Sequence, residues 1–86
     1  MDKNALTEAA ARRTAAAGSG LEPDDVERVI DALFGTVEQP GVIAEGLRSG
    51  ETVTVIGFGA FQLDDGFRPV LRSGQALNEY VNGRAG

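Results

Sequence analysis

A change in hydrophobic period near Glu51 constrains the fold of this 86-residue chain more than any other feature. Upstream of it, apolar residues recur at the three- and four-residue spacing of a helix that buries one stripe. Downstream, β-branched and aromatic residues follow a period of two from residue 52 to 63, interrupted by glycine. The sequence therefore predicts an α+β domain in which helices precede a sheet. The stripe consists of Val26, Val29, Ile30, Leu33, Phe34 and Val37.

The helical part divides at glycine and proline. An alanine-rich helix is predicted over residues 3–16 and is broken by residues 18–20. The next helix is predicted to begin near Pro23, because proline suits a first helical position and acidic residues follow it. Pro40 predicts a break, after which a short helix continues to Ser49 and Gly50.

The second part predicts three strands and a short last helix. Asp65-Gly66 predicts a type I′ hairpin turn, since both central residues of that turn need positive φ. A third strand is predicted from Phe67 to Leu71, and it either lies at a sheet edge or starts pairing late because Pro69 cannot donate a ladder hydrogen bond. Ser73 is predicted to cap a helix whose apolar face is formed by Ala76, Leu77, Tyr80 and Val81.

Composition limits how such a chain can be stabilised. A single domain of this length buries a modest fraction of its surface, and the absence of cysteine and histidine excludes disulfides and a Cys/His zinc site. Dimerisation is the remaining way to stabilise the chain.

No cofactor is expected. No apolar run is long enough to span a membrane, so a cytoplasmic protein is expected, and the net charge of −5 opposes binding to polyanions.

The segment Val55 to Phe61, "VIGFGAF", resembles the HU and integration host factor family of histone-like DNA-bending proteins. The resemblance continues through "MDKNALTEAAARRT", "DDVERVIDALFGTV" and "VLRSGQALNEYV", with insertions at 15–20 and 39–44. It implies one HU-like domain over residues 1–86, helical over 1–50, with the sheet and last helix over 51–86. It also implies an intertwined homodimer associated with the bacterial nucleoid.

One departure from the family bears on function. Between its second and third strands the family carries a long basic β-arm whose tip wedges between base steps. Architectural proteins bend DNA by inserting such a wedge. Here Asp64-Asp65-Gly66 stands at that place. The resemblance therefore implies an arm-less member in which DNA bending is weakened or lost.

Two sets of residues are candidates for function. The segment around the last strand is similar to the one that touches the DNA backbone in the family, and a helix start beside a guanidinium suits one phosphate; a capped helix with a solvated arginine explains it equally well. The candidate phosphate contacts are Arg68, Arg72, Ser73, Gly74 and Gln75. The candidate core or dimer-interface residues are Val29, Leu33, Phe34, Phe58, Phe61, Phe67, Leu71 and Leu77.

Several hypotheses of function stay open. The first is an HU-like, DNA-binding homodimer with little bending. The second is a protein-interaction module that pairs with itself or with an armed HU-like subunit, or that presents acidic helices to a basic partner. A third is a body that recognises DNA through another surface. An enzyme is not expected, because Asp64 and Asp65 are adjacent in a tight turn, diverge, and have no accompanying nucleophile or base.

Overall fold

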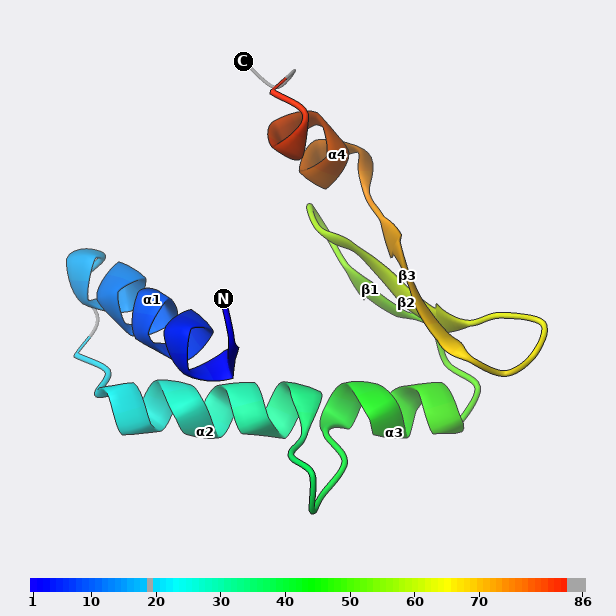
Figure 1. The fold of residues 1–86 in the computed structure, drawn as a ribbon, viewed down its shortest axis with the longest axis horizontal. Coiled ribbons are helices and arrows are strands. Elements are labelled where there is room, and N and C mark those ends of the chain that lie inside the picture. Colours follow the sequence, from blue (N-terminus) through cyan, green and yellow to red (C-terminus); the bar gives the residue numbers. More distant parts are fainter. Residues whose placement is uncertain (19, 84–86) are drawn as a thin grey trace. The chain divides into compact units, whose positions relative to one another are not determined.

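A computed structural model describes residues 1–18 and 20–83, and these residues form four helices and a three-stranded antiparallel sheet (Figure 1). The predicted α+β class is confirmed. The chain divides into two compact units, Met1–Val42 and Ile43–Gly86, so that nearly all of α3 groups with the sheet. The elements are α1 (Lys3–Ala16), α2 (Pro23–Phe34), α3 (Val42–Arg48), β1 (Val53–Val55), β2 (Gly59–Leu63), β3 (Pro69–Ser73) and α4 (Gln75–Val81).

Both helices of the first unit have polar caps at their N-termini. The Asp2 carboxylate accepts a hydrogen bond from the Ala5 N–H at 2.9 Å, which fixes the start of α1 one residue later. The second helix begins at Pro23, as predicted, and the Asp25 carboxylate accepts from the Glu22 N–H at 3.3 Å. The predicted break after α1 falls partly on Ser19, which lies outside the described residues.

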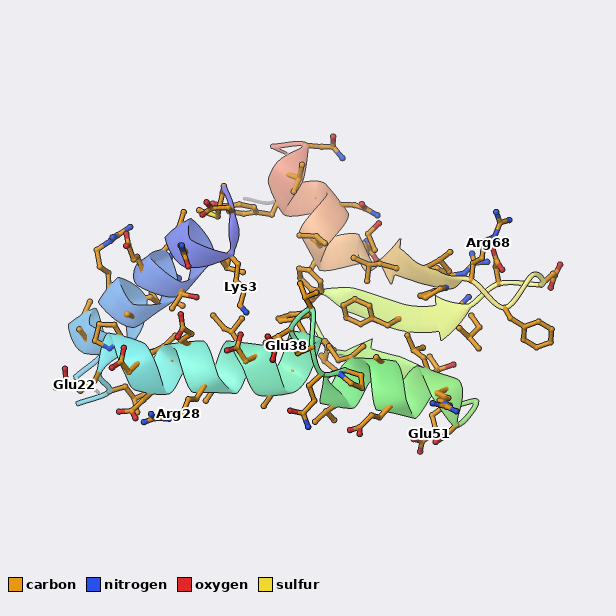
Figure 2. The ribbon with its side chains drawn as sticks, turned by 60° about the horizontal axis from the view of Figure 1, so that its bottom comes forward. Lys3, Glu22, Arg28, Glu38, Glu51 and Arg68 are labelled. Atoms are coloured by element: carbon orange, nitrogen blue, oxygen red, sulfur yellow. The ribbon has the colours of Figure 1, made fainter. Side chains whose placement is uncertain are left out.

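The core of the first unit is small. Val26 and Ile30 of α2 are buried against Ala11 of α1. The buried hydroxyl of Thr7 donates to the Lys3 carbonyl at 2.8 Å, so it needs no partner from α2. Lys3 also forms an ion pair with Asp31, and Figure 2 shows its side chain extending toward α2. The remaining apolar positions of the α2 stripe are exposed rather than buried.

The break between α2 and α3 comes earlier than predicted. The helix ends at Phe34, and Gly35 turns the chain with φ of 84°. Val37, predicted on the helical stripe, lies instead in the loop and is fully exposed. Proline disrupts a helix upstream of itself as well as at its own position, and a glycine with positive φ ends helices readily, which together account for the displacement.

This loop closes on itself. Gly35 and Pro40 form a β-bridge, and the Thr36 N–H donates to the Gln39 carbonyl at 2.8 Å. A Cβ atom on Gly41 would lie 2.5 Å from the Gly35 nitrogen and from the Leu33 carbonyl oxygen, so only glycine fits. The chain therefore leaves α2 and returns next to its point of departure.

The sheet of the second unit has the order β1-β2-β3, and both pairs are antiparallel (Figure 1). The prediction that the third strand is an edge strand is confirmed, and Pro69 is its first residue. The strand itself was misplaced, because it runs from Pro69 to Ser73 instead of from Phe67 to Leu71. Phe67 belongs to the preceding turn.

The turn between β2 and β3 is not of type I′. Its i to i+3 hydrogen bond joins the Phe67 N–H to the Asp64 carbonyl at 2.9 Å, and the residue with positive φ, 61°, is Phe67. Gly66 has negative φ. A three-residue hairpin loop of this kind combines a type I turn with a left-handed third residue. Gly66 therefore lies one position before Phe67, the residue whose positive φ would suit a glycine.

Candidate nucleic-acid contact surface

The strand register separates the sheet into a polar and an apolar face. Thr54, Ala60 and Arg72 are directly paired across the three strands and therefore share a face. Gln62 and Val70 form the next row of that face. The side chains of the opposite face are Val53, Val55, Phe61, Leu63, Pro69, Leu71 and Ser73, of which Ser73 alone is polar.

The apolar face is only partly covered within the described part of the second unit, since Val53, Phe61 and Leu63 are half-buried and none of them is fully buried. Leu47 of α3 is the one hydrophobic residue of this unit that is buried among those described. Val55 and Leu71 each keep more than 40% of their surface exposed. A soluble protein rarely leaves a continuous apolar surface of this kind uncovered.

The predicted interface residues occupy the two units as follows. Val29, Leu33 and Phe34 lie on α2 and are exposed; Phe58 and Leu71 are exposed beside or within the sheet; Phe61 and Leu77 are half-buried; and Phe67 is 81% exposed in the turn. None of the eight is buried within its own chain. The prediction that they form an interface stays a prediction.

Of the two arginines among the predicted phosphate contacts, Arg72 is the one without an ion-pair partner among the described residues. It is the last residue but one of β3 and is exposed. Because its neighbours in the polar face are a hydroxyl, an amide and small apolar side chains, its guanidinium is free to meet an anion.

The three residues after Arg72 are already engaged with other groups. The Ser73 hydroxyl donates to the Asn78 side-chain oxygen at 2.8 Å, and the Gly74 N–H donates to the Phe58 carbonyl at 2.8 Å. The Gln75 amide donates to Glu79 at 2.8 Å. The predicted capping role of Ser73 is wrong: Ser73 is the last residue of β3, and Gly74 occupies the N-cap position of α4.

Arg68 differs from Arg72 because its charge is matched. Its guanidinium pairs with the Asp64 carboxylate at 3.3 Å, at the far end of the hairpin from α4 (Figure 2). The other oxygen of Asp64 accepts from the N–H groups of Gly66 at 2.8 Å and Arg68 at 2.9 Å. Asp64 therefore fixes the turn and neutralises the cation in it.

Sequence reasoning missed this role of Asp64. The signal was available, because aspartate commonly accepts hydrogen bonds from backbone N–H groups two residues later in a turn, especially before glycine. Asp65-Gly66 also matches the sequence signal of a two-residue turn, and that signal predicts a shorter loop. Read as an Asx turn, Asp64 defines a longer loop and explains why Arg68 is held in place.

Cations without an acidic partner are few in the described part of the chain. They are Arg12, Arg13, Arg48 and Arg72, two in each unit, whereas Lys3, Arg28 and Arg68 are paired. Within the same residues, no three His, Cys, Asp or Glu side chains gather in a way that could hold a metal ion. None of the described helices is long and apolar enough to cross a membrane.

Comparison with known proteins identifies the family. A mutant of HU from Thermotoga maritima with a single substitution is 31% identical, with a TM-score of 0.71 over 94% of this chain and 99% of the other. The chain belongs to the HU family. HU from Thermotoga maritima itself is 32% identical, with a TM-score of 0.67 over 94% of this chain and 98% of the other. No protein-family model matches, and a search of curated proteins found no match.

Membership of the HU family confirms the resemblance seen in the sequence. The match covers nearly all of this chain and nearly all of each of the two HU chains. Within this HU-family fold, β2 and β3 are joined by residues 64–68 alone. This connection contains one cation, Arg68, which is paired with Asp64.

Proposed function

We propose that this HU-family protein is a homodimer that binds double-stranded DNA weakly, through backbone contacts of its body, with little or no bending. The observation that carries the proposal is the turn between β2 and β3, in which five residues hold a single cation paired with Asp64. A DNA-bending arm needs length, basic residues and an apolar tip that reaches the base steps. The short turn supplies neither the length nor the net positive charge.

The incompletely covered apolar face of the sheet supports the homodimer. Val55, Phe61 and Leu71 lie on one face, and none of them is buried within its chain. A two-fold axis would bring the same face of a second copy against it, which is the commonest arrangement of soluble dimers. The α2 side chains Val29 and Leu33 would add to the same kind of interface.

Arg72 supports the residual DNA contact. It is the exposed cation of the polar face of the sheet, without an ion-pair partner in the described part of the chain, and a dimer would carry two of them. α4 begins three residues after Arg72, and the N–H groups of a helix's first turn can donate to a phosphate oxygen. Ser73, Gly74 and Gln75 would then act as a scaffold rather than as direct ligands, because their polar groups are already engaged.

The number of cations sets the salt dependence that this function requires. The logarithm of the DNA association constant falls with the logarithm of salt concentration, with a slope of about −0.9 for each phosphate neutralised. Two Arg72 side chains give a slope of about −1.8, so affinity should fall about 12-fold between about 50 and 200 mM salt. A family member with several phosphate contacts would lose about 10³- to 10⁵-fold over that range.

Fluorescence anisotropy of a labelled duplex, intact and nicked, titrated with the protein at the two salt concentrations, tests the proposal. Arg72→Glu should abolish the weak binding, whereas Arg48→Glu removes another unpaired arginine of the same unit and should change it much less. A steep salt slope, or binding that survives Arg72→Glu, would contradict the proposed site and indicate a different DNA-binding surface.

A second candidate function is favoured by the net charge of −5. Two acidic subunits repel each other, whereas an acidic subunit and a basic subunit of the same fold attract. The chain would then act as a partner of an armed HU-like subunit and produce a one-armed dimer. Refolding the chain with HU from Thermotoga maritima and weighing the products by native mass spectrometry tests this pairing; homodimers alone would contradict it.

A further inference from the structure

The tip of the β2–β3 hairpin presents an aromatic ring that the fold of its own chain does not use. Phe67 is 81% exposed and has a φ of 61°. A bulky side chain in the left-handed region is a true outlier, and such outliers concentrate where a residue serves binding.

The neighbouring glycine shows that hairpin stability does not account for this arrangement. Gly66 has negative φ, and a Cβ atom there would meet its nearest neighbour, Asp64 Oδ1, at an ordinary 3.5 Å. A phenylalanine at position 66 and a glycine at 67 would satisfy the same turn without strain. The observed order instead places the ring on the strained residue.

The ring is also held on a fixed loop. Asp64 accepts two backbone hydrogen bonds, at 2.8 and 2.9 Å, and pairs with Arg68. A loop that is already ordered loses little conformational entropy when it binds. The hairpin tip therefore resembles a preformed knob, with Asp65 and Arg68 as charged neighbours of Phe67.

A pocket of suitable character lies in the other unit. It has a volume of about 360 Å³, is mainly apolar, and lies beside α1 where the chain enters α2. Two oppositely charged residues one helical turn apart on α1, Glu8 and Arg12, line it. The other lining residues are Ala11, Ala15, Leu21 and Pro23.

We propose that the Phe67 tip of one copy of the chain inserts into this pocket of another copy. The charges are complementary, since Asp65 of the tip can meet Arg12 of the pocket. Neither Asp65 nor Arg12 has an ion-pair partner among the described residues of its own chain. An apolar centre with a charge pair beside it is the arrangement that gives small interfaces their specificity.

The geometry of this contact determines what it assembles. The tip and the pocket are different surfaces, so the contact is heterologous and does not close on itself in general. A dimer would carry two tips and two pockets and would join with others into open chains. Because one hairpin tip buries little area, the contact is weak and forms at high protein concentration.

Sedimentation velocity between about 10 µM and 1 mM protomer tests the proposal on the full chain. The weight-average mass of the wild type should rise with concentration above that of a dimer, twice 9.0 kDa. Phe67→Ala should weaken this further association at least about tenfold and leave the dimer intact. Val37→Ala, at another fully exposed loop tip, is the matched control and should change nothing.

Mixing two deficient variants separates this contact from any other self-association. Ala15→Phe fills the pocket but keeps the tip, and Phe67→Ala keeps the pocket but lacks the tip. Each alone should fail to form large species, whereas ¹⁵N-labelled Phe67→Ala should show shifted α1 amide signals when unlabelled Ala15→Phe is added. Shifts confined to other elements would contradict the pocket assignment.

The charge pair provides a second test. Arg12→Glu should weaken the association, and Asp65→Arg in the same chain should restore part of it by recreating the pair with reversed sign. A wild-type mass that stays constant over the whole concentration range would overturn the proposal. That result would be independent of the DNA measurements, and loss of the dimer itself would be recognised by a mass of one chain.

Discussion

The strained turn residue gives a stability prediction that can be worked from the structure. Exchanging the two neighbours, Gly66→Phe with Phe67→Gly, keeps the composition of the chain and places glycine at the position with φ of 61°. Left-handed conformation costs a non-glycine residue about 1–2 kcal/mol. The unfolded-state entropy of the one glycine is nearly the same in both sequences, so that contribution cancels.

The loss of packing at position 67 is small by comparison. Because Phe67 is 81% exposed, about a fifth of its side-chain burial is at stake, about 0.3–0.6 kcal/mol. The exchanged variant should therefore be more stable by about 1 kcal/mol, which for a domain of this size raises Tm by about 4–8 °C. The exchanged variant is more stable only if the strain free energy relieved at position 67 exceeds the packing free energy that Phe67 provides.

Thermal and urea unfolding at equal protomer concentration measure this difference, since a dimer's Tm depends on concentration. The single variant Gly66→Phe, where a Cβ atom fits at 3.5 Å, should be close to neutral. Gly35→Ala should be strongly destabilising, because its Cβ atom would lie 2.6 Å from the Gly41 nitrogen. An exchanged variant no more stable than the wild type would refute the strain argument.

Other substitutions test further parts of the fold, each by urea unfolding. Asp64→Ala should lower the free energy of unfolding by about 1–3 kcal/mol, because two backbone donors and one cation lose their acceptor. Gly41→Ala should cost about 1–3 kcal/mol, since its Cβ atom would lie 2.5 Å from backbone atoms. Asp2→Ala should cost about 1 kcal/mol through loss of the α1 cap. Ser73→Ala should change stability by less than about 0.5 kcal/mol, because its hydroxyl makes an exposed side-chain contact and does not cap α4.

The helices and strands of this fold were predictable where the hydrophobic pattern was long or where a strong local signal marked an element boundary. Pro23 marked the start of α2, and the change of period marked the start of the sheet. The family resemblance rested on the glycine-phenylalanine segment and is confirmed by the HU structures. These features depend on local backbone preference and on a stripe of apolar residues, both of which a sequence displays directly.

The boundaries that were misplaced depend on contacts with specific atoms. Val37 fits the helical spacing, yet the backbone closure between Gly35 and Gly41 removes it from the helix. Ser73 is a good capping residue by type, but its strand pairing with Gly59 extends β3 through it. The turn type depended on Asp64, whose carboxylate selects a three-residue loop over the two-residue one.

The candidate contact surface was predictable only in part. The segment from Arg72 to Gln75 follows from the resemblance, and the structure shows which of its polar groups are free. The ion pair between Arg68 and Asp64 could be recognised only from the turn geometry, because the two residues are four apart in a segment with no regular structure. The pocket beside α1 could not be foreseen, because it is formed by residues from two segments of the chain.

The closed loop after α2 has a consequence for how this chain can be altered. Gly35 and Gly41 bring the two ends of the loop together, and the residues between them bond mainly to each other. The entropy of closing such a loop grows slowly, by about 0.6 kcal/mol for each doubling of length. A peptide tag, a fluorophore-labelled segment or a small domain inserted between Val37 and Glu38 should therefore be accommodated without unfolding the helices on either side, provided both glycines are retained.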